Sequence, residues 1–269
     1  MLGTYVELYL EADKSDNDLM QISEFAFDEI NRIERIMSFH DRTSELSYIN
    51  QNAHKKCCAI SIELEEVIAR SLDISKQSNG LFDITIADDM IKAGLLPMQK
   101  TDTVITISAS FKDIILPGDQ TIAFKQPLLI DLGGIAKGYA VDKAYQKIVD
   151  HVDDVVINAG GDLKHKCWQN KSVLIQTNNE DVIPITMHAP AQATSSWYYQ
   201  DNQKAAIMNP IRKFFSQTKQ TVSVCAKECM TADALTKLCF LMDNPEDILQ
   251  NFGAKALYFD SNNQQIWRS

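Results

Sequence analysis

The segment LLIDLGGIAKGYAVDKA, residues 128–144, contains a lysine and three glycines within six residues, at a point where phosphate chemistry is possible. Its apolar start predicts a strand, and the pattern from Lys137 onward predicts a helix. Gly133 and Gly134 leave bare backbone near the N-terminus of that helix, where phosphate groups bind favourably. Lys137 opposes the helix dipole, which costs stability unless an anion lies nearby. The alternative is a tight turn with a solvated lysine, and this segment alone favours neither.

Four other segments place polar residues at the ends of predicted elements. They are MSFHDRTSELSYIN (37–50), SNGLFDITI (78–86), VVINAGGDL (155–163) and CMTADALTKLCFL (229–241). In the third, Asp162 follows a second glycine turn, and in the fourth, Asp233 lies in the first turn of a predicted helix. The spacing in residues 128–144 is neither GxGxxG nor GxxxxGK[ST], so this segment is not a Rossmann fingerprint or a P-loop.

In their set and order, the five segments resemble the ApbE family, the FAD:protein FMN transferases. The matching stretches are Ser38–Asn50, Gly80–Thr85, Asp131–Asp142, Asn158–Asp162 and the residues from Ala232 onward. The stretch DLGGIAKGYAVD matches most specifically, and the resemblance extends from residue 2 to about residue 245. It implies a T-fold-like α+β architecture with largely antiparallel sheets flanked by helices. It also implies one domain over residues 1–269, or two intimately packed subdomains.

The resemblance implies a reaction as well. The protein would bind FAD, a magnesium ion (Mg²⁺) would bridge the FAD pyrophosphate, and a threonine or serine hydroxyl of a target protein would attack the phosphorus on the FMN side. AMP would leave, and FMN would stay attached through a phosphoester. Some members instead let water attack and hydrolyse FAD to FMN and AMP. Either reaction is phosphoryl transfer, which depends on positioning and charge stabilisation. The expected partner is a subunit of a flavinylated redox complex.

Individual roles follow from the same resemblance. The expected catalytic residues are Asp162, Asp233 and Lys137. The positions that match metal ligands are the backbone carbonyl of Gly134, Asp233 and Thr236. The positions that match cofactor contacts are Leu2, His40, Gly80, Leu81, Phe82, Asp131, Lys137 and Ile207. Asp162 would act on the attacking hydroxyl or assist metal binding, and its alternative role is a capped turn beside Gly161.

The predicted metal-site helix departs from the family pattern. The family has a threonine four residues after the aspartate, so that both side chains reach one ion from the same helix face. Here that position is Lys237, and Thr236 lies three residues after Asp233. An ammonium beside Asp233 could form an ion pair and occupy the place of the metal. The alternatives to a transferase are therefore a flavin-binding or partner-binding relative without transfer activity, and a FAD pyrophosphatase.

Other positions also depart from the family pattern. They are Ser196 for a glycine, Ala206 for a histidine, Asn209 for an aspartate and His40 for a tyrosine. Imidazole can stack on a flavin, but less extensively than a phenol ring.

Composition excludes several classes of protein. With 269 residues, 45% of them hydrophobic, the chain can form one large domain or two packed ones. A net charge of −10 argues against a nucleic-acid partner, because neutralising phosphates needs a basic face. Six cysteines are scattered without the spacing of a zinc site. Since no apolar run is long enough for a membrane span and no signal-like region begins the sequence, the expected location is the cytoplasm, unless a leader was removed.

The elements that must position these residues follow from hydrophobic periodicity. Helices are expected at 18–38, 62–78, 137–150, 230–242 and 245–252. Strands are expected at 4–11, 103–108, 121–125, 127–131, 154–158, 172–177, 183–188 and 220–226, followed by a hairpin around Asn262 and Asn263. Ser61 is the expected N-cap of the second helix, and Gly80 a left-handed stop after it. The mostly consecutive strands predict an α+β fold with antiparallel sheets.

Overall fold

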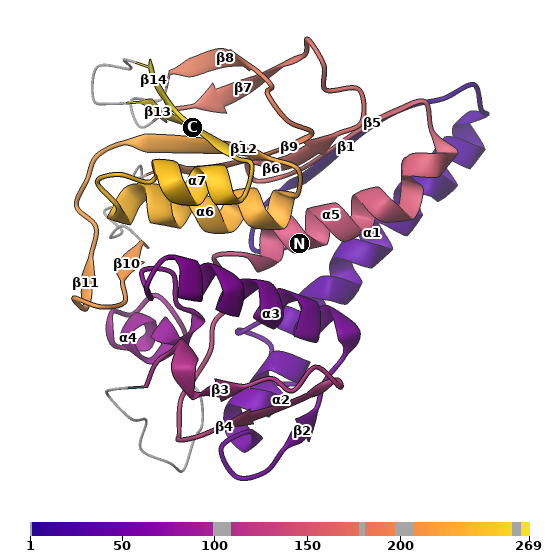
Figure 1. The fold of residues 1–269 in the computed structure, drawn as a ribbon. Helices are drawn as coiled ribbons and strands as arrows, with labels where there is room; N and C mark the ends of the chain where they lie inside the picture. Colours follow the sequence, from indigo (N-terminus) through magenta and orange to yellow (C-terminus); the bar gives the residue numbers. More distant parts are fainter. Residues whose placement is uncertain (1, 99–108, 178–180, 197–206, 260–264) are drawn as a thin grey trace. The chain divides into compact units, whose positions relative to one another are not determined.

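The chain forms two compact units. The structure, a computed structural model, describes residues 2–98, 109–177, 181–196, 207–259 and 265–269 (Figure 1). Unit 1 comprises Met1–Arg32, Lys137–Ile207 and Ser216–Ser269, and unit 2 comprises Ile33–Ala136 and Met208–Phe215. One boundary falls within helix α1 (Asp16–Met37) and another in the first turn of α5 (Ala136–Ile148). The expected domain organisation, one domain or two packed subdomains, stays a prediction.

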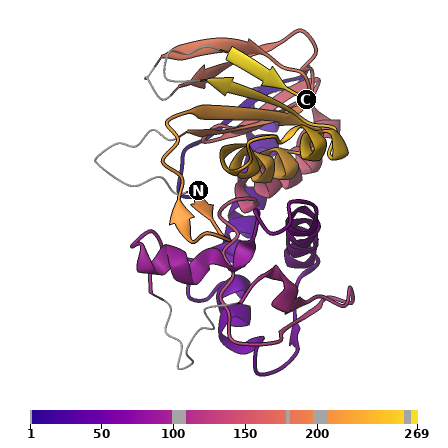
Figure 2. The ribbon, with the colours of Figure 1, turned by 60° about the vertical axis from the view of Figure 1, so that its left-hand side comes forward.

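Unit 1 is built on an antiparallel sheet of seven strands in the order β1-β5-β6-β9-β12-β13-β14. These strands are β1 (Val6–Glu11), β5 (Asp154–Ala159), β6 (Asp162–His165), β9 (Ala191–Ser196), β12 (Thr221–Ala226), β13 (Lys255–Phe259) and β14 (Gln265–Arg268). Helices α5 and α6 (Cys229–Leu241) cover one face, and the hairpin of β7 (Ser172–Gln176) and β8 (Val182–Thr186) lies on the other (Figures 1 and 2). The helix η3 (Val149–His151) follows α5, and α7 (Glu246–Asn251) precedes β13. The predicted α+β class with antiparallel sheets is confirmed.

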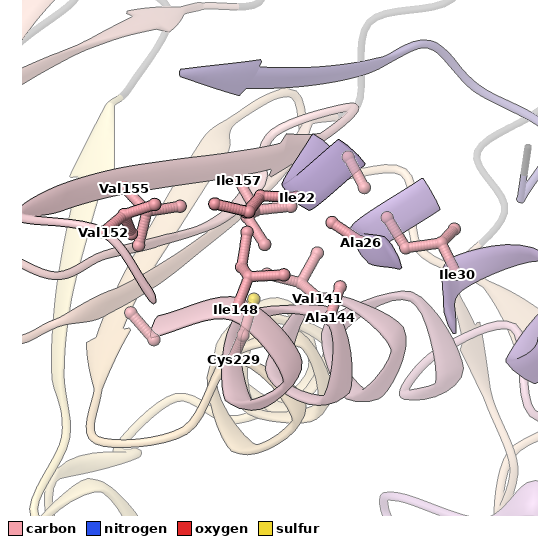
Figure 3. Packing of buried hydrophobic residues seen from close by; sticks show 12 residues of the cluster. Ile22, Ala26, Ile30, Val141, Ala144, Ile148, Val152, Val155, Ile157 and Cys229 are labelled. Atoms are coloured by element: carbon pink, nitrogen blue, oxygen red, sulfur yellow. The ribbon is translucent and has the colours of Figure 1, made fainter. Parts of the chain in front are cut away.

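The core of unit 1 lies between α1, α5 and the sheet. The apolar positions of α1 recur at helical spacing, so they face one side of the helix. Figure 3 shows them packed against residues of α5 and β5 and against the first residue of α6. The buried members that it labels are Ile22, Ala26, Ile30, Val141, Ala144, Ile148, Val152, Val155, Ile157 and Cys229. This packing holds the middle and end of α5, and the first residue of α6, against the same sheet.

In its described residues, unit 2 contains short strands and three α-helices of its own. The helices are α2 (Glu45–Asn52), α3 (Ile62–Gln77) and α4 (Ala87–Lys92), with the 3₁₀ helices η1 (Ile84–Ile86) and η2 (Phe111–Asp113). One sheet has the order β2-β4-β3 (Cys58–Ala59, Thr121–Phe124, Ile114–Ile115), and another pairs β10 (Met208–Asn209) with β11 (Phe214–Phe215). Ser61 caps α3 by accepting the N–H of Leu64 at 3.3 Å, which confirms the predicted N-cap.

The prediction of a strand at 127–131 is wrong. Residues 128–132 are buried for the most part but form neither strand nor helix. The N–H of Ile130 donates to Oδ1 of Asn50 on α2, and Nδ2 of Asn50 donates to the carbonyl of Ile130, each at 2.9 Å. A side-chain amide therefore satisfies the backbone groups that a neighbouring strand would otherwise pair.

Two other predictions fall on undescribed parts of the chain. The strand at 103–108 and the turn at Asn262 and Asn263 lie outside the described residues, although β13 and β14 do pair antiparallel. Within the described ranges, no helix combines the length and apolarity needed to cross a bilayer.

Candidate active site

Two buried aspartates and two partly exposed lysines form a cluster in unit 1. The ammonium of Lys137 on α5 pairs with the carboxylate of Asp162 and lies 3.5 Å from Oδ2 of Asp233 on α6. The ammonium of Lys237, one helical turn further along α6, pairs with Oδ1 of Asp233. Asp162 is 1% exposed and Asp233 is fully buried. The charges thus alternate in the order Asp162, Lys137, Asp233, Lys237, which we call the charge chain.

The charge chain accounts for the position of Lys137 on its helix, whereas its predicted contact with FAD stays a prediction. The sequence predicted that a lysine in the first turn of this helix needs an anion nearby. That anion is supplied by Asp162 and Asp233, so Lys137 is an ion-paired residue and not a solvated one. The protein's own carboxylates thereby offset the unfavourable position of the lysine on the helix.

Asp142 fixes the first turn of α6, which carries Asp233. Its Oδ1 accepts the N–H of Cys229 at 3.0 Å, and its Oδ2 accepts the N–H of Met230 at 2.9 Å. These N–H groups have no partner within the helix, so a carboxylate from α5 satisfies them. Lys164 donates to the same carboxylate at 2.6 Å. This role of Asp142 was not predicted beyond its place in the matching segment, although a charge among apolar helix positions was a usable signal.

Gly138 brings α5 and α6 close together. A Cβ at this position would lie 2.3 Å from the carbonyl oxygen of Cys229, closer than any side chain allows. The N–H of Gly138 donates to Oδ2 of Asp233 at 3.3 Å. The third glycine of the segment therefore serves a contact between two helices and exposes a backbone donor to Asp233.

Asn158 caps the glycine turn that precedes Asp162. Gly160 and Gly161 both have positive φ angles, 61° and 97°, and Oδ1 of Asn158 accepts the N–H of Gly161 at 2.9 Å. The capping role considered for Asp162 thus belongs to Asn158. The turn directs the chain into β6 with the Asp162 carboxylate against Lys137.

Unit 2 contains the turn predicted to contact the flavin. Gly80 has a φ of +83°, and its N–H donates to the carbonyl of Ser75 at 2.8 Å, so it ends α3 as predicted. The N–H of Phe82 donates to Oγ of Ser78 at 3.1 Å. Phe82 is buried and Leu81 is half-buried. The end of α3 therefore holds this turn in place.

Asp83 connects the same turn to a later segment. Its Oδ1 accepts the N–H of Thr85 at 2.9 Å, and its Oδ2 accepts the N–H of Phe111 at 3.0 Å. Burial raises the pKa of Asp83, and these hydrogen bonds oppose the increase. Sequence reasoning did not assign Asp83 a role.

The remaining predicted site residues occupy separate places. In unit 2, the N–H of Asp131 donates to the carbonyl of Ile84 at 2.8 Å, burial raises the pKa of Asp131, and His40 is exposed. In unit 1, Leu2 packs against the core, and Ile207 is buried with its carbonyl accepting the N–H of Ser216 at 2.8 Å. Of the predicted residues of unit 1, the charge chain brings together the three expected catalytic ones.

Comparison with known proteins identifies the family. The sequence profile of the ApbE family matches residues 2–257. The chain belongs to the ApbE family. Two relatives are named FAD:protein FMN transferase. The one from Vibrio cholerae is 23% identical over 222 residues, covering 74% of this chain and 66% of the relative. The one from Haemophilus influenzae is 25% identical over 272 residues, covering 89% of this chain and 78% of the relative.

Solved structures of similar fold cover nearly the whole of this ApbE-family chain. The ApbE protein of Thermotoga maritima has a TM-score of 0.82 at 22% identity, covering 100% of this chain and 94% of that one. The flavin transferase ApbE of Vibrio cholerae has a TM-score of 0.79 at 20% identity, covering 99% and 94%. At these identities the comparison shows the fold. The ApbE fold predicted from the five motifs is confirmed.

The two carboxyl groups of the charge chain differ in acidity. For Asp162, burial and the nearby charge of Asp233 raise the pKa to about 6, although Lys137 opposes the increase. Burial also acts to raise the pKa of Asp233, but Lys137 and Lys237 outweigh it and lower the pKa to about 2. Burial lowers the pKa of Lys137, yet the two carboxylates outweigh it and the pKa rises. Asp162 is therefore the carboxylate of this pair that takes up a proton first as the pH falls.

Thr236 points toward the sheet. Its hydroxyl donates to the backbone carbonyl of Asp233 at 2.7 Å and lies 2.7 Å from Oγ of Ser195 on β9. Because the Thr236 hydrogen goes to that carbonyl, Ser195 is the donor of the second bond. Thr236 is fully buried, so its hydroxyl is committed to these two partners.

The arrangement around Asp233 does not fit a magnesium ion. Magnesium takes oxygen ligands in near-octahedral geometry. One carboxylate oxygen of Asp233 contacts Lys237, and the other faces Lys137 and accepts the N–H of Gly138. In the part of the chain that the structure describes, no group of three or more His, Cys, Asp and Glu side chains is placed to hold a metal ion. The magnesium site expected at Asp233, Thr236 and the Gly134 carbonyl stays a prediction, and ammonium groups lie against the oxygens that it would need.

Proposed function

We propose that this protein is an FAD:protein FMN transferase. It would move FMN from FAD to a threonine or serine hydroxyl of a target protein and release AMP. Its relatives carry this name, and the chain spans 66% to 78% of the length of the two described above. The observation that carries the proposal is the charge chain. Phosphoryl transfer relies on fixed charges and positioning, which buried and paired ionic groups supply without reorganising.

Asp162 is the group that we assign to the proton of the attacking hydroxyl. A general base works best when its pKa lies near the working pH, and the pKa of Asp162 is raised to about 6. At neutral pH this carboxylate is ionised and basic enough to accept a proton. Asp233, with a pKa of about 2, stays ionised and holds Lys137 and Lys237 in place.

Lys137 is assigned to the phosphoryl group. Its side chain is partly exposed, whereas the carboxylates that hold it are buried, so its charge can reach a bound anion. The acceptor oxygen would form a bond to the FMN-side phosphorus while the bond from that phosphorus to the oxygen of the departing AMP breaks. The hydroxyl proton would pass to Asp162, and Lys137 would stabilise the negative charge on the phosphoryl oxygens.

The finer parts of the proposal concern the ligands. In unit 2, the turn at Gly80–Phe82, together with Asp131 and His40, is proposed to contact FAD. Leu2 and Ile207 in unit 1 are proposed contacts as well. The acceptor is proposed to lie on a subunit of a flavinylated redox complex. The proposed reaction does not depend on magnesium, because the residues around Asp233 do not fit this ion as they are arranged.

The proposal is tested by following FAD with a peptide that carries an acceptor threonine. Chromatography would quantify AMP, and mass spectrometry would detect FMN on the peptide. Asp162→Asn should lower kcat on the order of a hundredfold and abolish the rise of activity around pH 6. Asp154→Asn is the matched control, since this buried aspartate of the same sheet pairs with His165 outside the charge chain.

Three results would contradict the proposal in different ways. AMP with free FMN would indicate a FAD pyrophosphatase. Bound but intact FAD would indicate a flavin-binding relative without transfer activity. Equal activity in Asp162→Asn and the wild type would remove the assigned role of Asp162 while leaving the reaction in place.

A further inference from the structure

We infer that Lys237 is the resident cation of the Asp233 site, so that this site needs no divalent ion. One consequence of the inference, FMN transfer in the absence of added metal, rests on the proposed function. The occupancy of the site can be tested without that function. The geometry, the charge balance and the exposure of Lys237 each contribute to the inference.

The geometry places the ammonium where an ion would bind Asp233. Lys237 lies four residues after Asp233, on the same face of α6. Its Nζ contacts Oδ1 of the Asp233 side chain and lies 3.0 Å from the backbone carbonyl oxygen of the same residue. A single ammonium thus contacts two oxygens of one buried residue.

The second oxygen of Asp233 also faces positive groups. Oδ2 accepts the N–H of Gly138 at 3.3 Å and lies 3.5 Å from Nζ of Lys137. A cation that entered would have to displace Lys237 or lie beside two ammonium groups, and at such distances like charges repel strongly in a buried site. The ammonium of Lys237 therefore occupies the position that a cation would take, and the two ammonium groups together repel a cation that approaches Asp233.

The charge balance leads to the same conclusion. The charge chain holds two carboxylates and two ammonium groups, so its formal charge is zero. Without a bound anion, adding a divalent ion would leave two uncompensated positive charges beside the buried carboxylates, which is costly. Replacing Lys237 by a neutral residue would instead leave one negative charge, which a cation would offset.

Exposure separates Lys237 from a purely structural lysine. Its side chain remains 22% exposed, whereas Asp233 is fully buried. The ammonium can therefore meet a phosphate oxygen from the solvent side while Asp233 holds it from within. If Lys237 occupies the cation position at Asp233, its removal should let a cation bind there, so cation binding is the decisive measurement.

The first experiment measures manganese binding to purified protein by electron paramagnetic resonance, with and without FAD. The wild type should bind no Mn²⁺ at this site, and Lys237→Thr should gain one bound ion. Lys237→Arg, which keeps the charge, should behave as the wild type. Lys227→Thr is the matched control, because it removes an exposed lysine just before α6 and should gain no ion. Circular dichroism would check that each variant is folded.

The second experiment measures AMP release with magnesium or with EDTA. Wild-type release should be the same in both. In EDTA, the rate of AMP release by Lys237→Thr should be lower than that of the wild type by about tenfold or more, as expected when an electrostatic stabiliser is removed. Magnesium should restore the rate of this variant. Lys227→Thr should match the wild type in both conditions.

Two results would overturn the inference. One is wild-type activity that disappears in EDTA and returns with magnesium. The other is wild-type Mn²⁺ binding that is lost in Asp233→Asn. If no protein releases AMP while Lys237→Thr alone gains Mn²⁺, the resident cation is supported and the proposed transferase reaction fails.

Discussion

The two units position their functional segments by different kinds of interaction. In unit 1, ionic groups do so, since Asp142 holds the start of α6 and Lys137 bridges Asp162 and Asp233. In unit 2, side chains instead hold backbone groups without an ion pair: the amide of Asn50 pairs with both backbone groups of Ile130, and the carboxylate of Asp83 accepts the N–H groups of Thr85 and Phe111. Ion pairs respond to pH and to a charged ligand, whereas an amide pair such as that of Asn50 with Ile130 holds a backbone with little response to either. The difference suits a charged centre in unit 1 and a fixed loop in unit 2.

The largest expected effect comes from breaking the charge chain. Asp233→Asn would leave two lysines with less compensation in a buried site, so the free energy of unfolding should fall by about 3–5 kcal/mol. Urea titration monitored by circular dichroism measures this loss. Asp247→Asn, an exposed change on α7, should stay within about 0.5 kcal/mol of the wild type. A similar small loss for Asp233→Asn would mean that these ion pairs contribute little to unit 1.

Removing the two hydrogen bonds between the Asn50 side chain and the Ile130 backbone should have the next largest effect on the free energy of unfolding. Asn50→Leu would leave the N–H and carbonyl of Ile130 buried without this partner, at a cost of about 2–4 kcal/mol for two groups. The loss should be the same in low and high salt because no charge is removed. Asn52→Leu on the same helix removes only an exposed bond to the carbonyl of Tyr48 and should cost less. Urea titrations that gave equal losses would show that the pair does not support the loop.

A steric change at the contact between α5 and α6 should have an intermediate effect. Gly138→Ala improves helix propensity, but its Cβ would lie 2.3 Å from the Cys229 carbonyl oxygen, so the clash outweighs the gain. We expect a net loss of about 1–3 kcal/mol, together with reduced activity because Asp233 must shift. Thermal unfolding and AMP release measure the two effects. Lys147→Ala on the exposed part of α5 is the control, and a stabilised Gly138→Ala variant would contradict the close approach.

The smallest effects should come from two aspartates of opposite pH response. Burial acts to raise the pKa of Asp154, but the hydrogen bond with His165 and those from two backbone N–H groups outweigh it and lower the pKa. Asp154 should therefore stabilise the fold above about pH 4, and this contribution should disappear as the pH falls through its lowered pKa. The pKa of Asp83 is raised, so its contribution should be present below about pH 4 and decline as the pH rises.

The measurement is the free energy of unfolding from pH 3 to pH 7 for the wild type, Asp154→Asn and Asp83→Asn. The advantage of the wild type over Asp154→Asn should shrink toward low pH, and its advantage over Asp83→Asn should shrink toward high pH. If the free energy of unfolding varied with pH in the same way for both variants, the two aspartates would not differ in their pH response as predicted.

Local elements and single caps could be predicted well from the sequence. The helix at 62–78 was found because its N-cap Ser61, its apolar spacing and the left-handed stop at Gly80 are all local signals. The strand at 127–131 was mistaken because an apolar run shows burial without showing what pairs with its backbone. The partner, Asn50, lies 80 residues earlier in the chain.

The candidate site could be predicted only in part. The motifs gave Asp162, Asp233 and Lys137 as expected catalytic residues, and the structure brings these three together. Asp142 and Gly138 were recognised only as members of a motif. In the structure, both contact the start of α6 and place this helix against α5. Spacing along one helix cannot reveal such a contact, because the second helix begins about 90 residues later, far outside any local interaction.

By itself, the sequence determined the family, the α+β class and the presence of a lysine in an unfavourable place at a helix start. Only the tertiary structure decided that two aspartates from other elements compensate this lysine. The contact of Lys237 with Asp233, in contrast, follows the spacing of four residues on one helix that the sequence already shows. The physical reason is that a buried charge must be paired, while the choice of its partner depends on which distant segments pack together. Many packings would satisfy the same sequence pattern, and the fold selects one of them.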